Sequence, residues 1–133
     1  MKLTKSKLKQ LIKEELKAVL LKETQKDSSK PESRKLNKQG MRYYRRKKYQ
    51  LALEKFKEAH EEDLKWTKPP YNAACQYALL GDVENAIIWL NKWVDNRPDQ
   101  NFKAMYNYVQ NDTDLDGIRG KKKFIKWLKT IKP

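Results

Sequence analysis

The sequence has almost none of the residues that form disulfides or transition-metal sites. Its 133 residues include one cysteine, Cys75, and one histidine, His60. A lone cysteine cannot form an internal disulfide, which favours a reducing compartment, and one Cys with one His does not make the usual tetrahedral metal cluster. We therefore expect a cytoplasmic protein with no bound metal or other cofactor.

Long apolar runs are missing from the N-terminus, although its lysines are similar to those that open an export signal. The longest apolar run there covers residues 18–21, whereas the core of a secretory signal needs about seven residues. No apolar run in the chain approaches the roughly 18 residues of a membrane span. We therefore expect neither export nor membrane insertion.

The sequence patterns of an active site are scarce as well. The four glycines form no phosphate-binding loop, and no serine or cysteine stands in a nucleophile motif. His60 is followed by Glu61, Glu62 and Asp63, but adjacent residues on a helix do not share a face. We interpret this stretch as a solvated acidic surface and predict that the protein is not an enzyme.

Positive charge is in excess, and it is unevenly spread. The net charge of +14 is the sum of +12 in residues 1–50 (17 Lys and Arg, 5 Asp and Glu), −3 in residues 51–100 (6 and 9) and +5 in residues 101–133 (8 and 3). A basic segment of this kind attracts phosphates, anionic membranes or acidic proteins. The first third of the chain is therefore a candidate for such contacts.

Hydrophobic spacing predicts helices throughout. Residues 1–23 place leucine, isoleucine and valine three and four apart among lysines, which predicts a basic amphipathic helix. Residues 24–33 contain no apolar side chain and are predicted to be a flexible linker. Beyond them come paired helices with legible breaks, such as Gly81 as a helix stop and Asp82 as the next N-cap. No segment alternates as a strand would, so the predicted fold class is all-α.

The helical part repeats itself every 34 residues. Small, aromatic and aliphatic residues recur at matching positions, namely Gly40 and Ala74, Tyr43 and Tyr77, Tyr49 and Val83, Ala52 and Ala86, and Phe56 and Leu90. A fixed period of this length indicates a solenoid of helix pairs. The small residues allow the two helices of each pair to approach closely.

These positions resemble the signature of the tetratricopeptide repeat (TPR) family. The first repeat carries Leu36, Gly40, Tyr43, Tyr49, Ala52, Phe56 and Ala59, and the second keeps Ala74, Tyr77, Ala86, Leu90 and Pro98. The resemblance implies a right-handed solenoid of helix hairpins, a TPR-like α–α superhelix, with repeats over 34–66 and 67–100 and an atypical capping pair over 101–133. A bulky tryptophan replaces the small Ala59 in the second repeat, so we expect an apolar cap formed by Trp93, Met105, Tyr106, Phe124 and Trp127.

In TPR proteins the first helix of each pair lines a concave groove that binds a peptide. Carried onto this chain, the resemblance implies a groove lined by Asn37, Met41, Tyr44, Arg45, Lys68, Tyr71, Asn72, Cys75 and Leu79. Aromatic, soft, amide and cationic side chains suit a peptide with acidic and apolar groups. The implied function is a non-enzymatic adaptor that binds a protein or peptide. Met41 and Cys75 equally suit the edge of the core, and Asn72 equally suits hydrogen bonds within its own helix pair.

A second hypothesis concerns binding to an anionic surface, either nucleic acid or membrane, through residues 1–50. Near Tyr44, the aromatic residue of this stretch expected to be exposed, lie the cations Arg42, Arg46, Lys47 and Lys48. Solvated cations that complement a helix C-terminus would have the same pattern. The basic helix at 1–23 leaves three alternatives: it caps the array, binds a partner helix, or lies on an anionic membrane.

The first half of an EF-hand calcium loop is matched by Asp112, Asp114, Asp116 and Gly117. The twelfth position of such a loop must supply a bidentate carboxylate, and here it is Lys123. A cation at that position opposes metal binding. We therefore expect a turn that leads into the last helix, with Leu115 and Ile118 packing inward.

Overall fold

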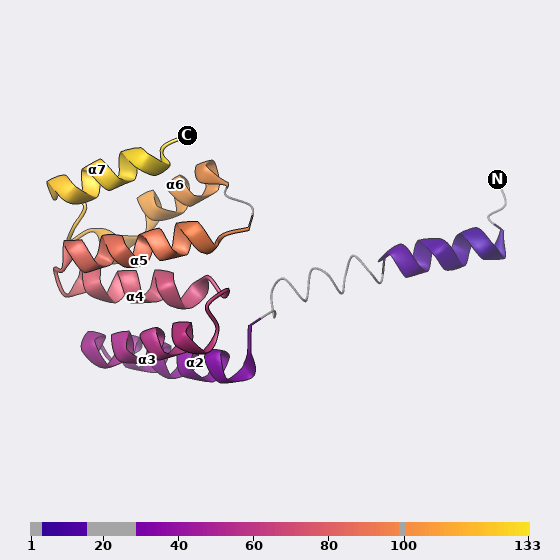
Figure 1. Cartoon of the computed structure of the whole chain (residues 1–133), viewed down its shortest axis with the longest axis horizontal. Helices are drawn as coiled ribbons and strands as arrows, with labels where there is room; N and C mark the ends of the chain where they lie inside the picture. Colours follow the sequence, from indigo (N-terminus) through magenta and orange to yellow (C-terminus); the bar gives the residue numbers. More distant parts are fainter. Residues whose placement is uncertain (1–3, 16–28, 99–100) are drawn as a thin grey trace.

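Every regular element in the described part of the chain is a helix (Figure 1). The computed structural model describes residues 4–15, 29–98 and 101–133. Residues 5–15 form an N-terminal helix. It is followed by α2 (Pro31–Arg45), α3 (Tyr49–Glu62), α4 (Lys68–Leu79), α5 (Val83–Asn96), α6 (Phe102–Asn111), the short 3₁₀ helix η1 (Thr113–Leu115) and α7 (Lys122–Ile131). The all-α prediction is confirmed for these ranges, and within them no helix has the length and apolar character needed to cross a membrane.

Consecutive helices pack side by side in chain order. The main contacts join α2 to α3, α3 to α4 and α4 to α5. In Figure 1, α2–α3 and α4–α5 accordingly form two layers, with α6 and α7 beyond α5. α7 contacts both α5 and α6, and η1 contacts α4. The C-terminal third therefore covers the second helix pair instead of standing apart from it.

The turns inside the two helix pairs have the same backbone geometry at positions 34 residues apart. The N–H groups of Lys48 and Asp82 each donate to the carbonyl five residues earlier, at 2.9 and 2.8 Å. The residue just before each donor lies in the left-handed region, with φ of 59° at Lys47 and 80° at Gly81. Backbone conformation thus follows the sequence period at this point, although only one of the two positions holds a glycine.

Exchanging residues at these two turns tests their equivalence. A non-glycine residue in the left-handed region costs about 1–2 kcal/mol, so Lys47→Gly is expected to raise the free energy of unfolding by about 1 kcal/mol. Gly81→Lys is expected to lower it by about the same amount; a Cβ at Gly81 would meet nothing within 4 Å, so the effect is one of backbone alone. Guanidinium unfolding measures both changes. Changes of the same sign would contradict the equivalence.

Two buried clusters hold the stack together. The smaller cluster joins the first helix pair to α4 and consists of Ala52, Leu53, Phe56 and Ala73. Tyr43 is partly buried against it, and Tyr77 packs against both clusters. The larger cluster runs from α4 and α5 through α6 and η1 to α7, and it includes Leu115 and Ile118. The five side chains expected to form an apolar cap all lie in or against this larger cluster.

The first helix of the stack begins earlier than expected. α2 starts at Pro31, inside the segment predicted as a linker over 24–33. Proline suits the first helical turn, because its missing N–H has no partner there. Ser33 is fully buried and its hydroxyl donates to the carbonyl of Ala59 at 2.7 Å, which ties the start of α2 to α3. The remainder of the predicted linker, 24–28, and residues 1–3 and 16–23 of the predicted N-terminal helix lie outside the described residues.

His60 is buried, which corrects the expectation of a solvated acidic surface. Its ring lies edge-on to Trp89, with 5.3 Å between the ring centroids. Burial, and to a lesser extent the nearby charge of Lys92, lowers the pKa of His60. The imidazole is therefore neutral at pH 7 and belongs to the packing between α3 and α5. The helical period failed to show this because α5 supplies the cover from outside the local segment.

Candidate ligand-binding pocket

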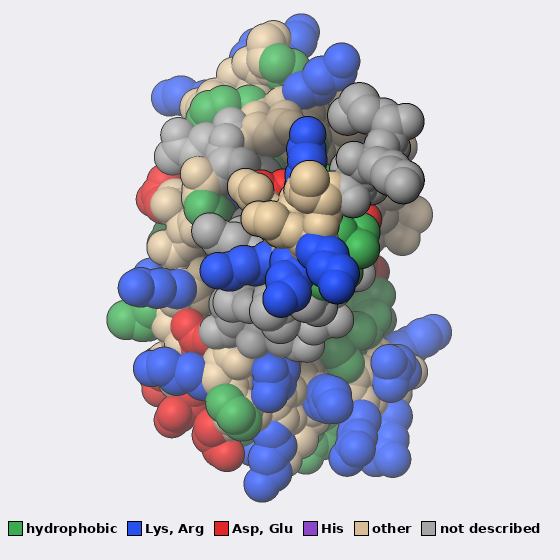
Figure 2. Space-filling view, turned by 90° about the vertical axis from the view of Figure 1, so that its right-hand side faces the viewer, with side chains coloured by type: hydrophobic (Ala, Val, Ile, Leu, Met, Phe, Trp, Pro, Cys, Tyr) green, Lys and Arg blue, Asp and Glu red, His purple; other side chains and the backbone are tan. Residues whose placement is uncertain are grey.

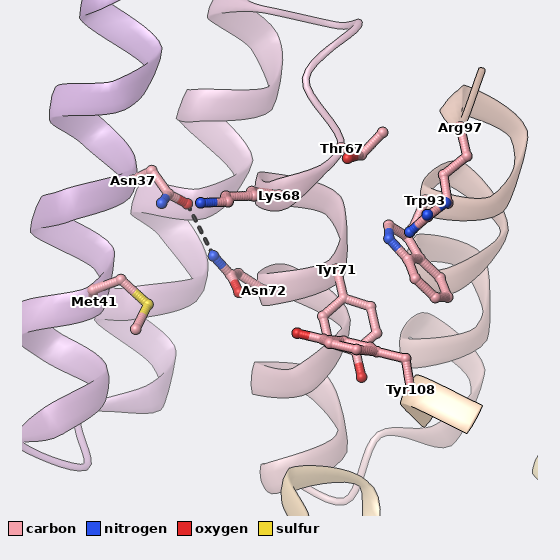
Figure 3. A pocket seen from close by; sticks show the side chains of 9 residues that line it. All are labelled: Asn37, Met41, Thr67, Lys68, Tyr71, Asn72, Trp93, Arg97 and Tyr108. Carbon is pink, nitrogen blue, oxygen red and sulfur yellow. Dashed lines mark hydrogen bonds between the residues drawn. The ribbon is translucent and has the colours of Figure 1, made fainter. Parts of the chain in front are cut away.

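An open pocket of about 470 Å³ lies between α2, α4, α5 and α6 (Figure 3). It is lined by Asn37, Met41, Thr67, Lys68, Tyr71, Asn72, Trp93, Arg97 and Tyr108. Helical spacing explains the convergence, since residues three and four apart on α2 and α4 project to one side of each helix. None of the nine lining residues is acidic.

Three aromatic rings form one wall of the pocket. The ring centroid of Tyr71 lies 4.7 Å from that of Trp93 and 5.0 Å from that of Tyr108. Tyr71 and Trp93 are 5% and 4% exposed, whereas Tyr108 is 58% exposed. The base of the wall is therefore fixed in the core, and its outer ring is open to a ligand. Such a surface suits an apolar or aromatic side chain.

Amide and cationic side chains occupy the other sides. Asn72 donates from Nδ2 to Oδ1 of Asn37 at 3.0 Å, which links α4 to α2 across the pocket (Figure 3). The Lys68 side chain is exposed at the rim. The guanidinium of Arg97 lies 5.5 Å from the centroid of the Trp93 ring. The pocket thus combines an apolar wall with a positively charged rim.

An acidic turn closes the neighbouring part of the groove. The hydroxyl of Tyr44, on α2, donates to both carboxylate oxygens of Asp114 at 2.9 and 2.8 Å. The hydroxyl of Tyr71, on α4, donates to Asp112 at 2.7 Å. The Cys75 sulfur lies 3.7 Å from the same Asp112 oxygen. The chain after α6 therefore supplies its own carboxylates to the first helices of both pairs.

The donors in this cluster keep their protons at neutral pH. Burial is the main cause that raises the pKa of Tyr44, of Tyr71 and of the Cys75 thiol, and the neighbouring aspartates add to each effect. Burial also raises the pKa of Asp114. A protonated, buried thiol is neither a good nucleophile nor a good metal ligand. Cys75 is therefore a packing and hydrogen-bonding residue in this arrangement.

The same cluster contains the three groups, within the described ranges, that could share a metal ion. One ligand atom each from Cys75, Asp112 and Asp114 lies within 4.8 Å of the others. Tyrosine hydroxyls already supply donors to both carboxylates. Asp112 also accepts from the N–H of Asp114 at 3.0 Å and so caps η1. The geometry is accounted for by these protein contacts, and the half EF-hand motif forms the capped turn.

The structure divides the predicted groove residues into two groups. Five of the nine line the pocket: Asn37, Met41, Lys68, Tyr71 and Asn72. Tyr44, expected to be exposed, is partly buried and bound to Asp114, and Cys75 belongs to the same cluster. Arg45 is exposed and Leu79 half-buried, and neither lines the pocket. The acidic turn covers this part of the groove, which the 34-residue period did not predict.

Four lining residues were not predicted: Thr67, Trp93, Arg97 and Tyr108. Trp93 was flagged as too large for its repeat position, and that size was the available signal. Tyr108 lies on α6, outside the repeat register. Of the cations predicted to bind anions, Arg42 and Arg46 line a separate hollow, whereas Lys47 and Lys48 are exposed in the α2–α3 turn.

Comparison of the chain with protein-family models, curated proteins and solved structures gave no match. The functional proposal therefore rests on the geometry of the pocket and its surroundings. An open aromatic wall, a linked amide pair and a cationic rim can bind a ligand.

Proposed function

We propose that the protein is a non-enzymatic adaptor that binds a peptide or protein segment in the pocket between α2, α4, α5 and α6. The observation that carries this proposal is the wall of Tyr71, Trp93 and Tyr108 beside the cations Lys68 and Arg97. Aromatic residues and arginine dominate the energetics of protein interfaces. A ligand that meets both features would carry an apolar side chain next to an acidic group.

The proposal extends to the architecture. We propose that the two helix pairs form a TPR-like right-handed solenoid and that α6 and α7 form its closing pair. Support comes from the matching turns at Lys47 and Gly81 and from the small residues Gly40 and Ala74 at the crossing points. Residues 5–15 would remain a separate amphipathic helix, since Leu8, Leu11 and Ile12 are each about half exposed.

Each lining residue has a distinct role in the proposed complex. The exposed ring of Tyr108 and the buried rings behind it would hold the apolar side chain of the ligand. Met41, flexible and polarisable, would adjust to its shape. Lys68 would attract the acidic group, and Asn72, held by Asn37, would present its remaining amide atoms to the ligand backbone. The acidic turn would exclude ligand from the Tyr44 side.

Peptides selected from a random display library on the full-length chain test the proposal. The selected peptides are expected to combine an aromatic or aliphatic residue with Asp or Glu. Tyr108→Ala and Lys68→Glu are each expected to weaken binding of a selected peptide about tenfold, the usual size of a hot-spot loss. Both side chains are exposed, so the substitutions spare the core. Tyr71 is unsuitable because it is buried and bound to Asp112.

Matched variants outside the pocket serve as controls. Ile125→Ala and Lys126→Glu change exposed residues of α7 in the same chemical sense and are expected to leave binding unchanged. Fluorescence anisotropy with a labelled peptide measures all four variants. Equal losses in the pocket and control variants would rule out this pocket as the binding site.

A further inference from the structure

A second surface lies on the side of α2 that faces away from the rest of the stack. Lys35, Lys38, Arg42 and Arg46 follow one another at spacings of three, four and four residues and are all exposed, so they share one face of the helix. Two adjoining hollows of about 390 and 420 Å³ lie along it and share Gln39 and Arg42. We call these four cations and Gln39 the α2 cationic face.

The sequence period shows what this face replaces. Lys35, Gln39 and Arg42 correspond to Pro69, Ala73 and Gln76 of α4, 34 residues later. All three residues of α4 are buried, and Ala73 belongs to the cluster that joins the two helix pairs. The face that α4 uses to pack on the preceding pair is thus cationic in α2. A further apolar helix pair could not be stacked there without burying charge.

The charges on this face are unpaired within the described residues. No carboxylate there forms an ion pair with any of the four cations, whereas nearby Lys55 lies 3.6 Å from Glu58. Figure 2 shows Lys and Arg side chains spread over the lower right of the molecule, with acidic side chains at the lower left. Unopposed cations in a row create a positive potential that attracts an extended anion.

The shape and chemistry of the face favour one kind of anion. The row spans 11 residues, or about 16 Å of helix at 1.5 Å per residue. The only apolar side chain in its two hollows besides Pro31 is the half-buried Tyr43, so the face offers little to insert into a membrane or to anchor a protein interface. A regular line of phosphates needs only such a row of cations.

We propose that the α2 cationic face binds the phosphate backbone of nucleic acid without reading its sequence. The face is separate from the pocket, because Asn37 and Met41 of the same helix point the other way, toward α4. Binding at this face therefore does not depend on the peptide-binding function, and each can fail without the other. Lys55, at the edge of the lower hollow, would add a contact from α3.

Fluorescence anisotropy with the full-length chain tests this inference. The probes are two fluorescein-labelled 20-base-pair DNA duplexes of unrelated sequence, titrated between 50 and 200 mM salt. Equal affinity for both duplexes and a linear fall of log K with log salt are expected. Neutralising Lys35→Gln, Lys38→Gln and Arg42→Gln together is expected to make the salt slope shallower by about 3, roughly one per lost phosphate contact.

The matched control neutralises three exposed lysines on one face of α7, Lys122→Gln, Lys126→Gln and Lys129→Gln. It removes the same charge, and its salt slope is expected to change by less than one third as much. All six positions are exposed, so the fold is retained, as circular dichroism would verify. A slope that is unchanged in the α2 variant, or equally changed in both variants, would overturn the proposal. So would stronger, equally α2-dependent binding to anionic lipid vesicles or to polyglutamate.

Discussion

Gly40→Ala is expected to lower the free energy of unfolding by about 2–3 kcal/mol, the cost of overpacking a closed core. A Cβ at this position would lie 2.5 Å from Cε1 of Phe56 and within 2.9 Å of two further ring atoms. Phe56 is fully buried and cannot move aside. In the second helix pair the equivalent residues are Ala74 and Leu90, a larger residue opposite a smaller one. The two pairs thus fill the same crossing with different residues.

A double-mutant cycle isolates this contact. Phe56→Leu alone is expected to cost about 1 kcal/mol because it leaves a small cavity. In the double variant Gly40→Ala, Phe56→Leu, which copies the second pair, the two changes are expected to compensate to within about 1 kcal/mol of the parent protein. Guanidinium unfolding of the four proteins gives the coupling energy. Additive losses would mean that the helices do not cross at these residues.

Asp112→Ala is expected to destabilise the protein by about 2–4 kcal/mol, since it removes both a helix cap and a hydrogen bond to a charged group. The Asp112 carboxylate accepts from the N–H of Asp114 and from the hydroxyl of buried Tyr71. Without it, the tyrosine hydroxyl loses its partner and η1 loses its cap. The turn would no longer be held against α4, and α6 would lose its anchor beside the pocket.

The matched variant is Asp112→Asn. An asparagine retains an oxygen for the cap and for Tyr71 and loses only the charge, so a cost of about 1 kcal/mol is expected. Thermal unfolding monitored by circular dichroism compares the two variants. If Asp112→Ala costs no more than Asp112→Asn, the turn is not fixed by this carboxylate, and the closed part of the groove would be open to ligand.

Helical periodicity predicted the elements that repeat, because small and large residues 34 positions apart impose the same local packing. The helix class, the turn at Gly81 and Asp82 and the cap residues around Trp93 were predictable in this way. The TPR resemblance and the groove function remain proposals. The start of α2 was missed because Ser33 is polar, and its burial depends on a carbonyl of α3.

The acidic turn could not be predicted from the period. Its hydrogen bonds join residues 70 and 41 positions apart, Tyr44 to Asp114 and Tyr71 to Asp112. Nothing in the local pattern of an aspartate indicates which distant tyrosine will donate to it. The consequence is functional, because the turn shortens the predicted groove and confines a ligand to the end that α5 and α6 complete.

One helix, α2, contributes to both proposed surfaces. Asn37 and Met41 line the pocket, while Lys35, Lys38 and Arg42 lie on the cationic face. Because α-helical geometry turns about 100° per residue, these sets project to different sides of the helix. A peptide and a polyanion could therefore bind the same chain at once.

The central claim is that a peptide ligand sits against the Tyr71, Trp93 and Tyr108 wall. The most direct measurement is the indole N–H spectrum of the ¹⁵N-labelled full-length protein during titration with a selected peptide. The Trp93 signal is expected to shift and saturate with the binding curve. The Trp127 signal, whose indole donates to Asn91 at 2.8 Å on another part of the fold, is expected to stay in place. A peptide that binds while the Trp93 signal does not move would contradict the account.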